Sequence, residues 1–468
     1  MDLRTITFGQ SVAGLLVDGV ETTPFTGATL KMEDLRGVVV EIPYIDHGDT
    51  EQFNHVNEWF ETRTPPRNLL LATPEGSIGL YGIRWLGHSP KPGVSLGKLA
   101  PSETLLGPCE ASLERPLVLD EVRSRIDGLQ EWTGLKSVGF VPETDEQGLS
   151  QAITVNVRAV KSETWAQGEA AMQFESDWRT SRPDETDDGG LNINDGAVLV
   201  TRFPSPRPFS EHLAEQRKVV SLLTLLSGQP IHFRQHKVSA ESIIERALSG
   251  DVLSHPKIQL VSEQTVRDYG QPVPSRGDLQ LFLAAFEQIG IDGMTRWASR
   301  YEQWKRFVLP AVGVLGRKGL FLEDVIVSLS MSVEAAGQII GHRDGEEVTY
   351  HRGRPITATY VFRCLDVLEI KWSGLAPSTN ALARAIAKTY NDIKHFDRGE
   401  FPEGDVLHVV GVVLRYIARL LALHIVDDSG SLLEGFREDR ALWRVQRVYE
   451  AYEISFNERG ETIRAEHA

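Results

Sequence analysis

The sequence predicts an α+β protein in which an N-terminal antiparallel β-rich domain, sandwich-like or barrel-like, precedes a C-terminal all-α helical bundle. Through roughly the first 200 residues, short alternating or β-branched runs are separated by Gly, Pro and Asp clusters, which is typical of short antiparallel strands. From Gly277 onward, apolar residues recur at helical spacing. The pattern changes near Pro208, so we expect a β-rich domain over 1–207, a helical or mixed connecting region over 208–294, and the bundle over 295–468.

The expected strands follow the β-branched runs, and turns are expected at Pro74-Glu75-Gly76 and at Pro90-Lys91-Pro92-Gly93. The acidic segment Ser181–Gly190 is interpreted as a solvated hairpin tip. The expected strands are Ile6–Phe8, Gly37–Ile45, Asn68–Ala72, Ile78–Leu86, Gln151–Val160 and Ala197–Arg202.

Helical periodicity begins at Ser210–Leu226, which stops at Ser227-Gly228. The stretch Ile231–Pro274 is expected to combine a returning strand, a short helix near Ser239–Leu248 and a linker. The loop Gly341–Pro355 should interrupt the bundle. The later helices are expected at Asp278–Ile289, Met294–Val308, Phe321–Ile340, Ile356–Ile370, Ser378–His395, Val406–Val426 and Leu432–Phe456.

Charge limits where a nucleic acid could bind. The formal net charge is −16, whereas phosphate binding is driven by clustered Lys and Arg. Residues 291–400 are the exception, because they hold 15 basic against 13 acidic residues while the rest of the chain holds 34 against 52. An RNA site is therefore expected in the C-terminal part.

The remaining composition favours a cytoplasmic protein with no membrane association. The first residues lack the blocks of a secretory signal, and the apolar stretch Val406–Val426 is interrupted by His408, Arg415, Arg419 and His424. The two cysteines, Cys109 and Cys364, stand far apart without metal-ligand neighbours, so neither a disulfide framework nor a zinc site is expected. The sequence contains no recognised metal-binding or cofactor-binding motif, so neither a metal nor a cofactor is expected.

One helix carries the chemistry that the sequence suggests. Pro377 and Ser378 provide a start, since a Ser hydroxyl can cap free backbone N–H groups. Leu382, Ile386 and Ile393 fall on one side. The opposite side presents what we name the polar ridge, made of Arg384, Lys388, Asn391 and His395. An ordinary solvated helix face gives the same pattern, so the polar ridge alone does not show whether this helix carries a functional site.

The end of this helix and its surroundings in the chain favour a function. The segment Asn391–Gly399 resembles the N-x-x-K-H-x-x-R-G end of the third core helix in ApeA-like HEPN domains. Upstream, Glu114–Leu119 followed by Leu129–Gly134 resembles the ApeA N-terminal domain, in which a strand leads into a short helix ending in an L-x-x-W-x-G turn. The chain thus resembles ApeA-like anti-phage proteins over roughly 1–270 for the N-terminal domain and 295–430 for the HEPN core.

The resemblance implies a HEPN dimer that cleaves RNA without a metal and leaves a 2′,3′-cyclic phosphate and a 5′-hydroxyl. His395 would act as general acid or base, Asn391 would orient it or the phosphate, and Lys388 would stabilise the phosphorane. The phosphate-binding candidates are Arg384, Lys394 and Arg398, and the supporting candidates are Asp392, Glu334 and Arg415.

This sequence departs from the HEPN signature, which is Arg, four to six residues, then His. The positions before His395 that fit this spacing hold Tyr390, Thr389 and Lys388, and Lys lacks the planar fork that grips phosphate in two places.

Two functions therefore stay open. In the first, the chain is an abortive-infection endoribonuclease that is held inactive until a phage-derived trigger arrives. It would cleave RNA, with tRNA as a candidate, as a homodimer or higher homo-oligomer. In the second, the helical domain only dimerises or binds RNA, and the β-rich half senses a ligand or a protein.

Overall fold

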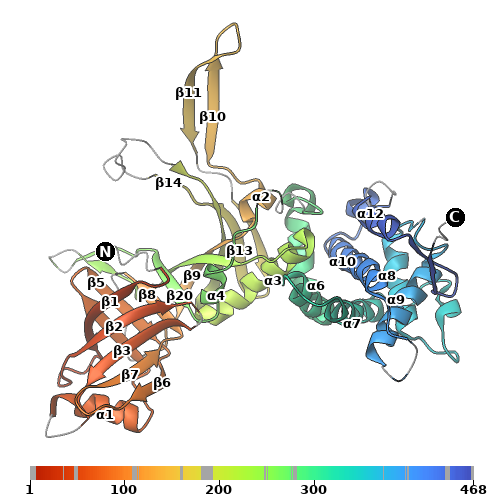
Figure 1. Ribbon diagram of the computed structural model, residues 1–468. Coiled ribbons are helices and arrows are strands. Elements are labelled where there is room, and N and C mark those ends of the chain that lie inside the picture. The colour runs from red at the N-terminus through yellow and green to blue at the C-terminus, as the bar shows by residue number, and fades with distance from the viewer. Residues whose placement is uncertain are drawn as a thin grey trace.

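The computed structural model describes residues 7–34, 36–46, 51–107, 113, 115–158, 162–180, 193–246, 249, 251–275, 277, 282–372, 374–395, 397, 400–437 and 443–464. A large antiparallel sheet forms the N-terminal half and helices form the C-terminal half (Figure 1). The predicted α+β class, with a β-rich part preceding a helical bundle, is confirmed.

Fourteen described strands join one sheet, in which every neighbouring pair is antiparallel and the order is β12-β13-β16-β9-β17-β20-β8-β5-β4-β1-β2-β3-β7-β6. The strands of this sheet are β1 (Ser11–Val17), β2 (Thr26–Glu33), β3 (Gly37–Tyr44), β4 (Asn68–Thr73), β5 (Gly76–Tyr81), β6 (Arg84–Ser89), β7 (Ser95–Ala100), β8 (Glu103–Leu106), β9 (Leu119–Ile126), β12 (Glu163–Gln167), β13 (Ala170–Ser176), β16 (Ala197–Arg207), β17 (Phe233–Ser239) and β20 (Ile258–Ser262).

Within the described residues, four smaller two-stranded sheets accompany it. They are β10 (Val138–Thr144) with β11 (Ser150–Val157), β14 (Arg179–Thr180) with β15 (Ile193–Asn194), β18 (Glu245–Arg246) with β19 (Val252–Ser254), and β21 (Ile454–Phe456) with β22 (Thr462–Arg464).

The helices concentrate in the second half of the chain. The described α-helices are α1 (Asn54–Glu61), α2 (Leu129–Thr133), α3 (Phe209–Ser227), α4 (Val266–Tyr269), α6 (Phe286–Leu315), α7 (Leu322–Ile340), α8 (Thr357–Leu368), α9 (Thr379–Lys394), α10 (Gly404–Val426), α11 (Ser431–Glu434) and α12 (Trp443–Ala451), and η1 (Glu51–Phe53) and η3 (Glu346–Thr349) are 3-10 helices.

Two apolar cores lie within this architecture. Strands β1–β8 and helix α1 enclose the first, where the ring of Phe60 sits directly over Gly97. The second is larger and continuous: it begins between the β9–β16 part of the sheet and α3, and it runs through α6 into the α7–α10 bundle. The sheet and the helices are therefore joined by packed side chains and not by the chain alone.

The predicted L-x-x-W-x-G turn marks the joint between these parts. β9 leads into α2, and Gly134 ends that helix in the left-handed conformation (φ 67°). Trp132 is buried and packs edge-on against Phe174 of β13 and Phe286 of α6. Its indole N–H donates to the carbonyl of Ala284 at 2.9 Å. The start of α6 is thereby fixed to the sheet.

Two predicted helices are wrong. No helix forms within the described part of Ser239–Leu248, because the backbone N–H of Glu241 donates to the Asp120 carboxylate and the chain turns instead of coiling. Leu432–Phe456 is also not one helix: α12 ends before Glu453, whose φ is 53°. Ile454 and Phe456 then alternate as buried residues of β21.

Smaller differences occur elsewhere. The predicted strand Ile78–Leu86 is two strands, β5 and β6, separated at Gly82, whose φ is 63°. The predicted helix Met294–Val308 is part of the longer α6, which continues through Pro310 to Leu315. The acidic segment Ser181–Gly190, the first strand's Ile6 and Cys109 lie outside the described residues.

Helix α10 is long and apolar enough to cross a membrane by composition, with a mean hydropathy of 1.9 over its most apolar window. However, 72% of that window is buried among the other elements. The central helix of a soluble bundle is equally long and apolar. The packing of α10 against the other elements keeps most of its apolar side chains away from solvent.

Close helix packing in the bundle gives a stability prediction. A Cβ atom on Gly337 of α7 would lie 2.2 Å from the Tyr360 carbonyl oxygen of α8, so Gly337→Ala must push two backbones apart. We expect a loss of ~1–3 kcal/mol in the free energy of unfolding, measured by urea denaturation. Gly313→Ala in α6 is the matched control, because nothing lies within 4 Å and the change should stabilise the helix by ~0.5–1 kcal/mol. Equal effects of the two substitutions would contradict the packing described.

Candidate functional site

The predicted start of α9 is confirmed. The hydroxyl of Ser378 accepts the backbone N–H of Ala381 at 3.2 Å, which caps the helix. Leu382 and Ile386 are buried as expected, and Ile393 is partly buried. Four alanines of α9 are also buried, so its packed side is wider than the predicted apolar stripe.

The upper end of the polar ridge is occupied by the protein itself. The Arg384 guanidinium donates to the carbonyls of Glu458, at 2.8 Å, and Val348, at 2.5 Å. It thereby ties α9 to the turn between β21 and β22 and to η3. These partners describe a structural link for Arg384, and a phosphate-binding role for it stays a prediction.

Lys388 and Asp392 are brought together one helical turn apart, where they form an ion pair. The Lys388 side chain is 52% exposed, whereas that of Asp392 is 16% exposed. A surface pair of this kind contributes at most ~1 kcal/mol to stability and is easily exchanged for another anion. Lys388 is therefore both accessible and loosely held.

A second group forms around Lys394, whose ammonium lies 5.4 Å from the centre of the Tyr390 ring. The positive charge of Lys394 also acts on the carboxyl group of Glu334 in α7. Burial raises the pKa of the Glu334 carboxyl, while the Lys394 charge and a hydrogen bond from Thr357 oppose the rise. The structure thus brings Glu334 and Lys394, two predicted residues from different helices, into one electrostatic neighbourhood.

His395 is the residue that ends α9. Its backbone N–H donates to the Asn391 carbonyl at 2.9 Å, and its side chain is half-buried, while the Asn391 side chain is exposed. The lower ridge, made of Lys388, Asn391 and His395, therefore lies at the surface at one end of the bundle. Arg398 lies outside the described residues, so its position relative to His395 is a prediction only.

Arg415 belongs to another part of the bundle. It is half-buried on α10, where burial lowers the pKa of its guanidinium. One turn later, Arg419 donates to the carbonyl of Leu226 at 2.8 Å, at the end of α3. Burial also lowers the pKa of Arg419, to about 10. This face of α10 is turned toward α3.

Sequence reasoning missed the buried ion pair beside the ridge. Glu346 of η3 is fully buried, and the Arg363 guanidinium donates to both of its carboxylate oxygens at 2.6 and 2.7 Å. The Tyr350 hydroxyl donates to the same carboxylate at 2.6 Å. These bonds, Arg363 first, lower the pKa of Glu346 to about 2. The pair holds the Gly341–Pro355 loop against α8, and this loop supplies the carbonyl that Arg384 binds.

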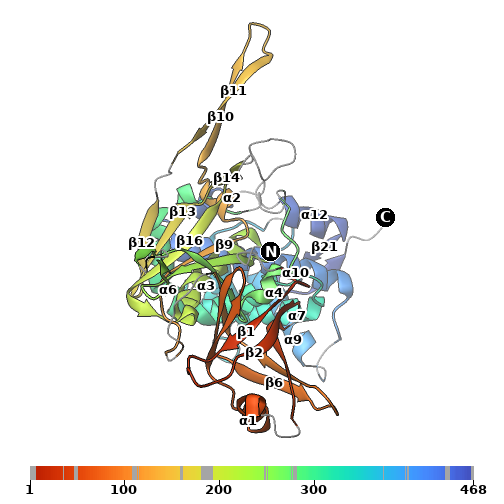
Figure 2. The same ribbon diagram turned by 90° about the vertical axis from the view of Figure 1, so that its left-hand side faces the viewer.

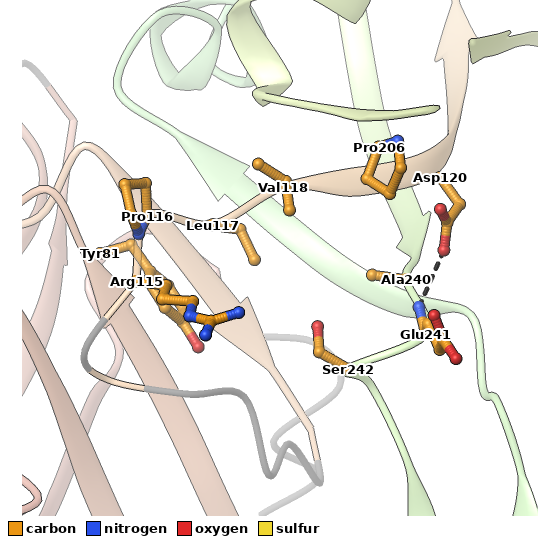
Figure 3. A pocket seen from close by; sticks show the side chains of 10 residues that line it. All are labelled: Tyr81, Arg115, Pro116, Leu117, Val118, Asp120, Pro206, Ala240, Glu241 and Ser242. Atoms are coloured by element: carbon orange, nitrogen blue, oxygen red, sulfur yellow. Dashed lines mark hydrogen bonds between the residues drawn. The ribbon is translucent and has the colours of Figure 1, made fainter. Parts of the chain in front are cut away.

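The N-terminal half contains a cavity of about 380 Å³ between the two parts of the large sheet. Apolar side chains form part of its wall, and polar groups lie at two sides: Asp120 accepts the backbone N–H of Glu241 at one side, and the Arg115 and Tyr81 side chains lie at the other (Figure 3). The lining residues are Tyr81, Arg115, Pro116, Leu117, Val118, Asp120, Pro206, Ala240, Glu241 and Ser242.

An adjoining cavity of about 390 Å³ shares Tyr81, Pro116 and Leu117 with the first and reaches the start of α3. Burial, together with the neighbouring Glu263 carboxylate, raises the pKa of Glu103 in its wall to about 7. The Glu263 carboxylate forms an ion pair with Arg84, and Arg67 also lines this cavity, so its wall carries groups of both charges. Among the described residues, no cluster of three His, Cys, Asp or Glu is placed to hold a metal.

The comparisons with known proteins concern mainly this half. A family model described as ApeA N-terminal domain 1 matches residues 27–297. No curated protein and no solved structure matches the chain.

The Glu103 carboxyl gives a pH prediction. Its pKa is about 7 in the fold and near 4.5 in the unfolded chain, so the folded state binds the proton more tightly. The free energy of unfolding should therefore fall as pH rises through that interval. Glu103→Gln removes this loss, so its stability advantage over the parent, measured by urea denaturation, should shrink by about 2 kcal/mol from pH 8 to pH 5. A constant difference between the two proteins would show that Glu103 is not held in this state.

Proposed function

The chain belongs to the ApeA N-terminal domain 1 family, a family of anti-phage defence proteins, and on this premise we propose that it is an abortive-infection endoribonuclease whose helical half is a HEPN domain. The observation that supports this proposal is the lower polar ridge, where Lys388, Asn391 and His395 lie at the surface on one end of a rigidly packed bundle.

The proposed chemistry uses these side chains and no metal. The His395 imidazole can either take the proton of an RNA 2′-hydroxyl as a base or give a proton to the leaving 5′-oxygen as an acid. Lys388 would leave its exposed ion pair with Asp392 to meet the phosphate, which costs little because such pairs are weak. Asn391 would orient the phosphate, and Lys394 and Arg398 would add positive charge.

One ridge offers one imidazole, whereas the reaction uses both an acid and a base. Two copies of α9 facing each other across a two-fold axis would supply the pair. We therefore propose that the enzyme works as a homodimer or higher homo-oligomer on RNA, with tRNA as a candidate substrate. The β-rich half would keep it inactive in the cytoplasm until a phage-derived trigger arrives.

A second function is favoured by two observations. Lys388 stands where the HEPN signature has Arg, and Arg384 is engaged by backbone carbonyls. The adjoining cavities of the N-terminal half offer room for a small ligand or a peptide. In this alternative, the helical half only dimerises or binds RNA, and the β-rich half senses a ligand or protein.

Replacement of His395 tests the catalytic proposal. His395→Ala should lower cleavage of purified total tRNA in EDTA by ~10²–10⁴-fold, because the general acid or base is lost. It should change the free energy of unfolding by less than ~1 kcal/mol, since a half-buried imidazole at a helix end buries little apolar area. Undiminished cleavage by this variant would exclude α9 as the active site, and loss of parental cleavage in EDTA would exclude the metal-independent mechanism.

Lys388 is tested separately. Lys388→Ala should reduce cleavage, whereas Lys388→Arg should retain or increase it, because Arg restores the bidentate grip of the signature. Lys305→Ala is the matched control, since Lys305 also forms an exposed ion pair one turn along its helix, with Glu302 of α6. Equal loss in the two alanine variants would indicate a general charge effect.

The composite site also predicts an oligomeric state. Light scattering at micromolar concentration should give the mass of a dimer or a multiple of it. Asn391→Cys at the proposed two-fold axis should then form an intersubunit disulfide on mild oxidation. A monomer, or a dimer in which this disulfide fails to form, would contradict the paired arrangement of α9.

A further inference from the structure

Strands β10 and β11 form a hairpin that extends away from the rest of the described chain, as both ribbon views show (Figures 1 and 2). We name residues 138–157 the arm. The pairing is regular from Val138↔Val157 to Glu143↔Ala152, so direct cross-strand partners share a face.

The two faces of the arm differ in chemistry. One face, named the arm face, is entirely apolar and consists of the cross-strand pairs Val138↔Val157, Phe140↔Val155 and Pro142↔Ile153. The opposite face consists of Gly139↔Asn156, Val141↔Thr154 and Glu143↔Ala152. On the arm face, Phe140 is 67% exposed, Ile153 62% and Val155 41%.

This arrangement is unfavourable for a surface that only meets water. An isolated two-stranded hairpin is marginally stable, and contiguous exposed apolar side chains mark binding surfaces. The alternation that normally buries one face of a strand pair in a core here leaves Phe140, Ile153 and Val155 exposed. The arm face therefore has the contiguous exposed apolar side chains that are expected of a binding surface.

The arm is firmly attached at its root. The Asp195 carboxylate accepts the backbone N–H groups of Ser137, at 3.1 Å, and Val138, at 3.3 Å. The N–H of Arg158 donates to the Ser137 carbonyl at 2.9 Å. The root comes directly after α2, and Trp132 of α2 contacts the start of α6. Binding at the arm would therefore act on the contacts of Trp132, where the sheet meets α6.

The area of the arm face and the charge of the arm indicate which kind of partner can bind there. Strands of seven and eight residues offer under ~400 Å², about half of the ~800 Å² per partner that a stable interface needs, so the arm suits a reversible contact. The arm carries Glu143, Asp145 and Glu146 and no Lys or Arg, on a chain of net charge −16. A second copy or an anionic lipid surface would be repelled by the tip, whereas a basic protein would be attracted.

We propose that the arm face is the docking surface for a different protein, one that presents an apolar patch flanked by Lys and Arg. Combined with the proposed function, on which this identification rests, that protein is the phage-derived trigger. Its apolar patch covers Phe140, Val155 and Ile153, and its basic residues meet the acidic tip at Glu146. Because the root of the arm follows α2 in the chain, this binding changes the packing of Trp132 where the sheet meets α6.

Photocrosslinking in cells tests the surface without relying on RNA cleavage. The full chain carries p-benzoylphenylalanine in place of Phe140 or, as the matched control, in place of Thr154 on the opposite face. Irradiation after infection should give a heteromeric adduct from position 140 and not from position 154. A crosslink to a second copy or to lipid, equal adducts at the two positions, or no adduct would overturn the proposal.

The captured protein must then show the stated chemistry. Purified, it should bind the chain more weakly as salt rises. Binding should fall at least ~10-fold in the Phe140→Ser/Ile153→Ser variant and should also fall in the Glu146→Lys variant, while Thr154→Ser should change it less than twofold. Circular dichroism confirms that the variants fold. An acidic captured protein, or affinities that ignore these substitutions, would overturn the proposal.

The following experiments distinguish a failure of the proposed docking surface from a failure of the proposed ribonuclease activity. The crosslink is repeated in the His395→Ala background, where it should persist if docking is independent of cleavage. Infection-dependent RNA cleavage should be lost in the Phe140→Ser/Ile153→Ser variant and retained in Thr154→Ser. A crosslink without any RNA cleavage by the parent would reject the proposed ribonuclease and keep the docking surface, whereas full cleavage by the arm variant would reject the docking surface alone.

Discussion

The buried indole of Trp132 holds together the two halves of this protein. Its ring packs against Phe174 of the sheet and Phe286 of α6, and its N–H binds the Ala284 carbonyl just before that helix begins. Beyond the non-helical Gly290, Trp297 repeats the arrangement by donating to the Lys218 carbonyl of α3 at 2.8 Å. Two large apolar side chains, each with its single donor satisfied, thus fix α6 to the sheet at one point and to α3 at another.

Because α6 is fixed in this way, the second core continues without interruption from the sheet into the bundle. Arg419 adds a polar connection, since its guanidinium on α10 binds carbonyls at the end of α3. The proposed docking arm and the cavities lie on the sheet side of this joint, and α9 lies beyond it. Strands β1–β8 have a core of their own, and Tyr81 of β5 and Leu105 of β8 also pack into the second core. A signal from the arm would travel through α2, α6 and α7 by direct contacts.

The sequence predicted the elements whose signals are local. Helix α9 carries its cap at Ser378 and its apolar residues at helical spacing, and α2 carries the Trp and the Gly that its turn requires. Long-range pairings could not be predicted: β17 pairs with β9, more than a hundred residues away, and no local pattern reports that distance. The partners of Arg384 were missed for the same reason, because the carbonyl of Glu458 comes from a hairpin whose first strand had been predicted as helix. The second strand of the arm was predicted within Gln151–Val160, but its pairing with β10 was not, and the exposed apolar residues of the arm depart from the rule that alternation indicates a buried face.

Native-state hydrogen exchange tests most directly whether the sheet and the bundle are one cooperative unit. The shared core predicts that amides of β9, β16 and α3 and those of α7 and α10 exchange with the same free energy of opening, equal to that of global unfolding, while amides of the arm exchange at lower free energy. Trp132→Ala should lower the common value for both sets together. Bundle amides that open at a free energy well below that of the sheet, and that do not respond to Trp132→Ala, would contradict the account.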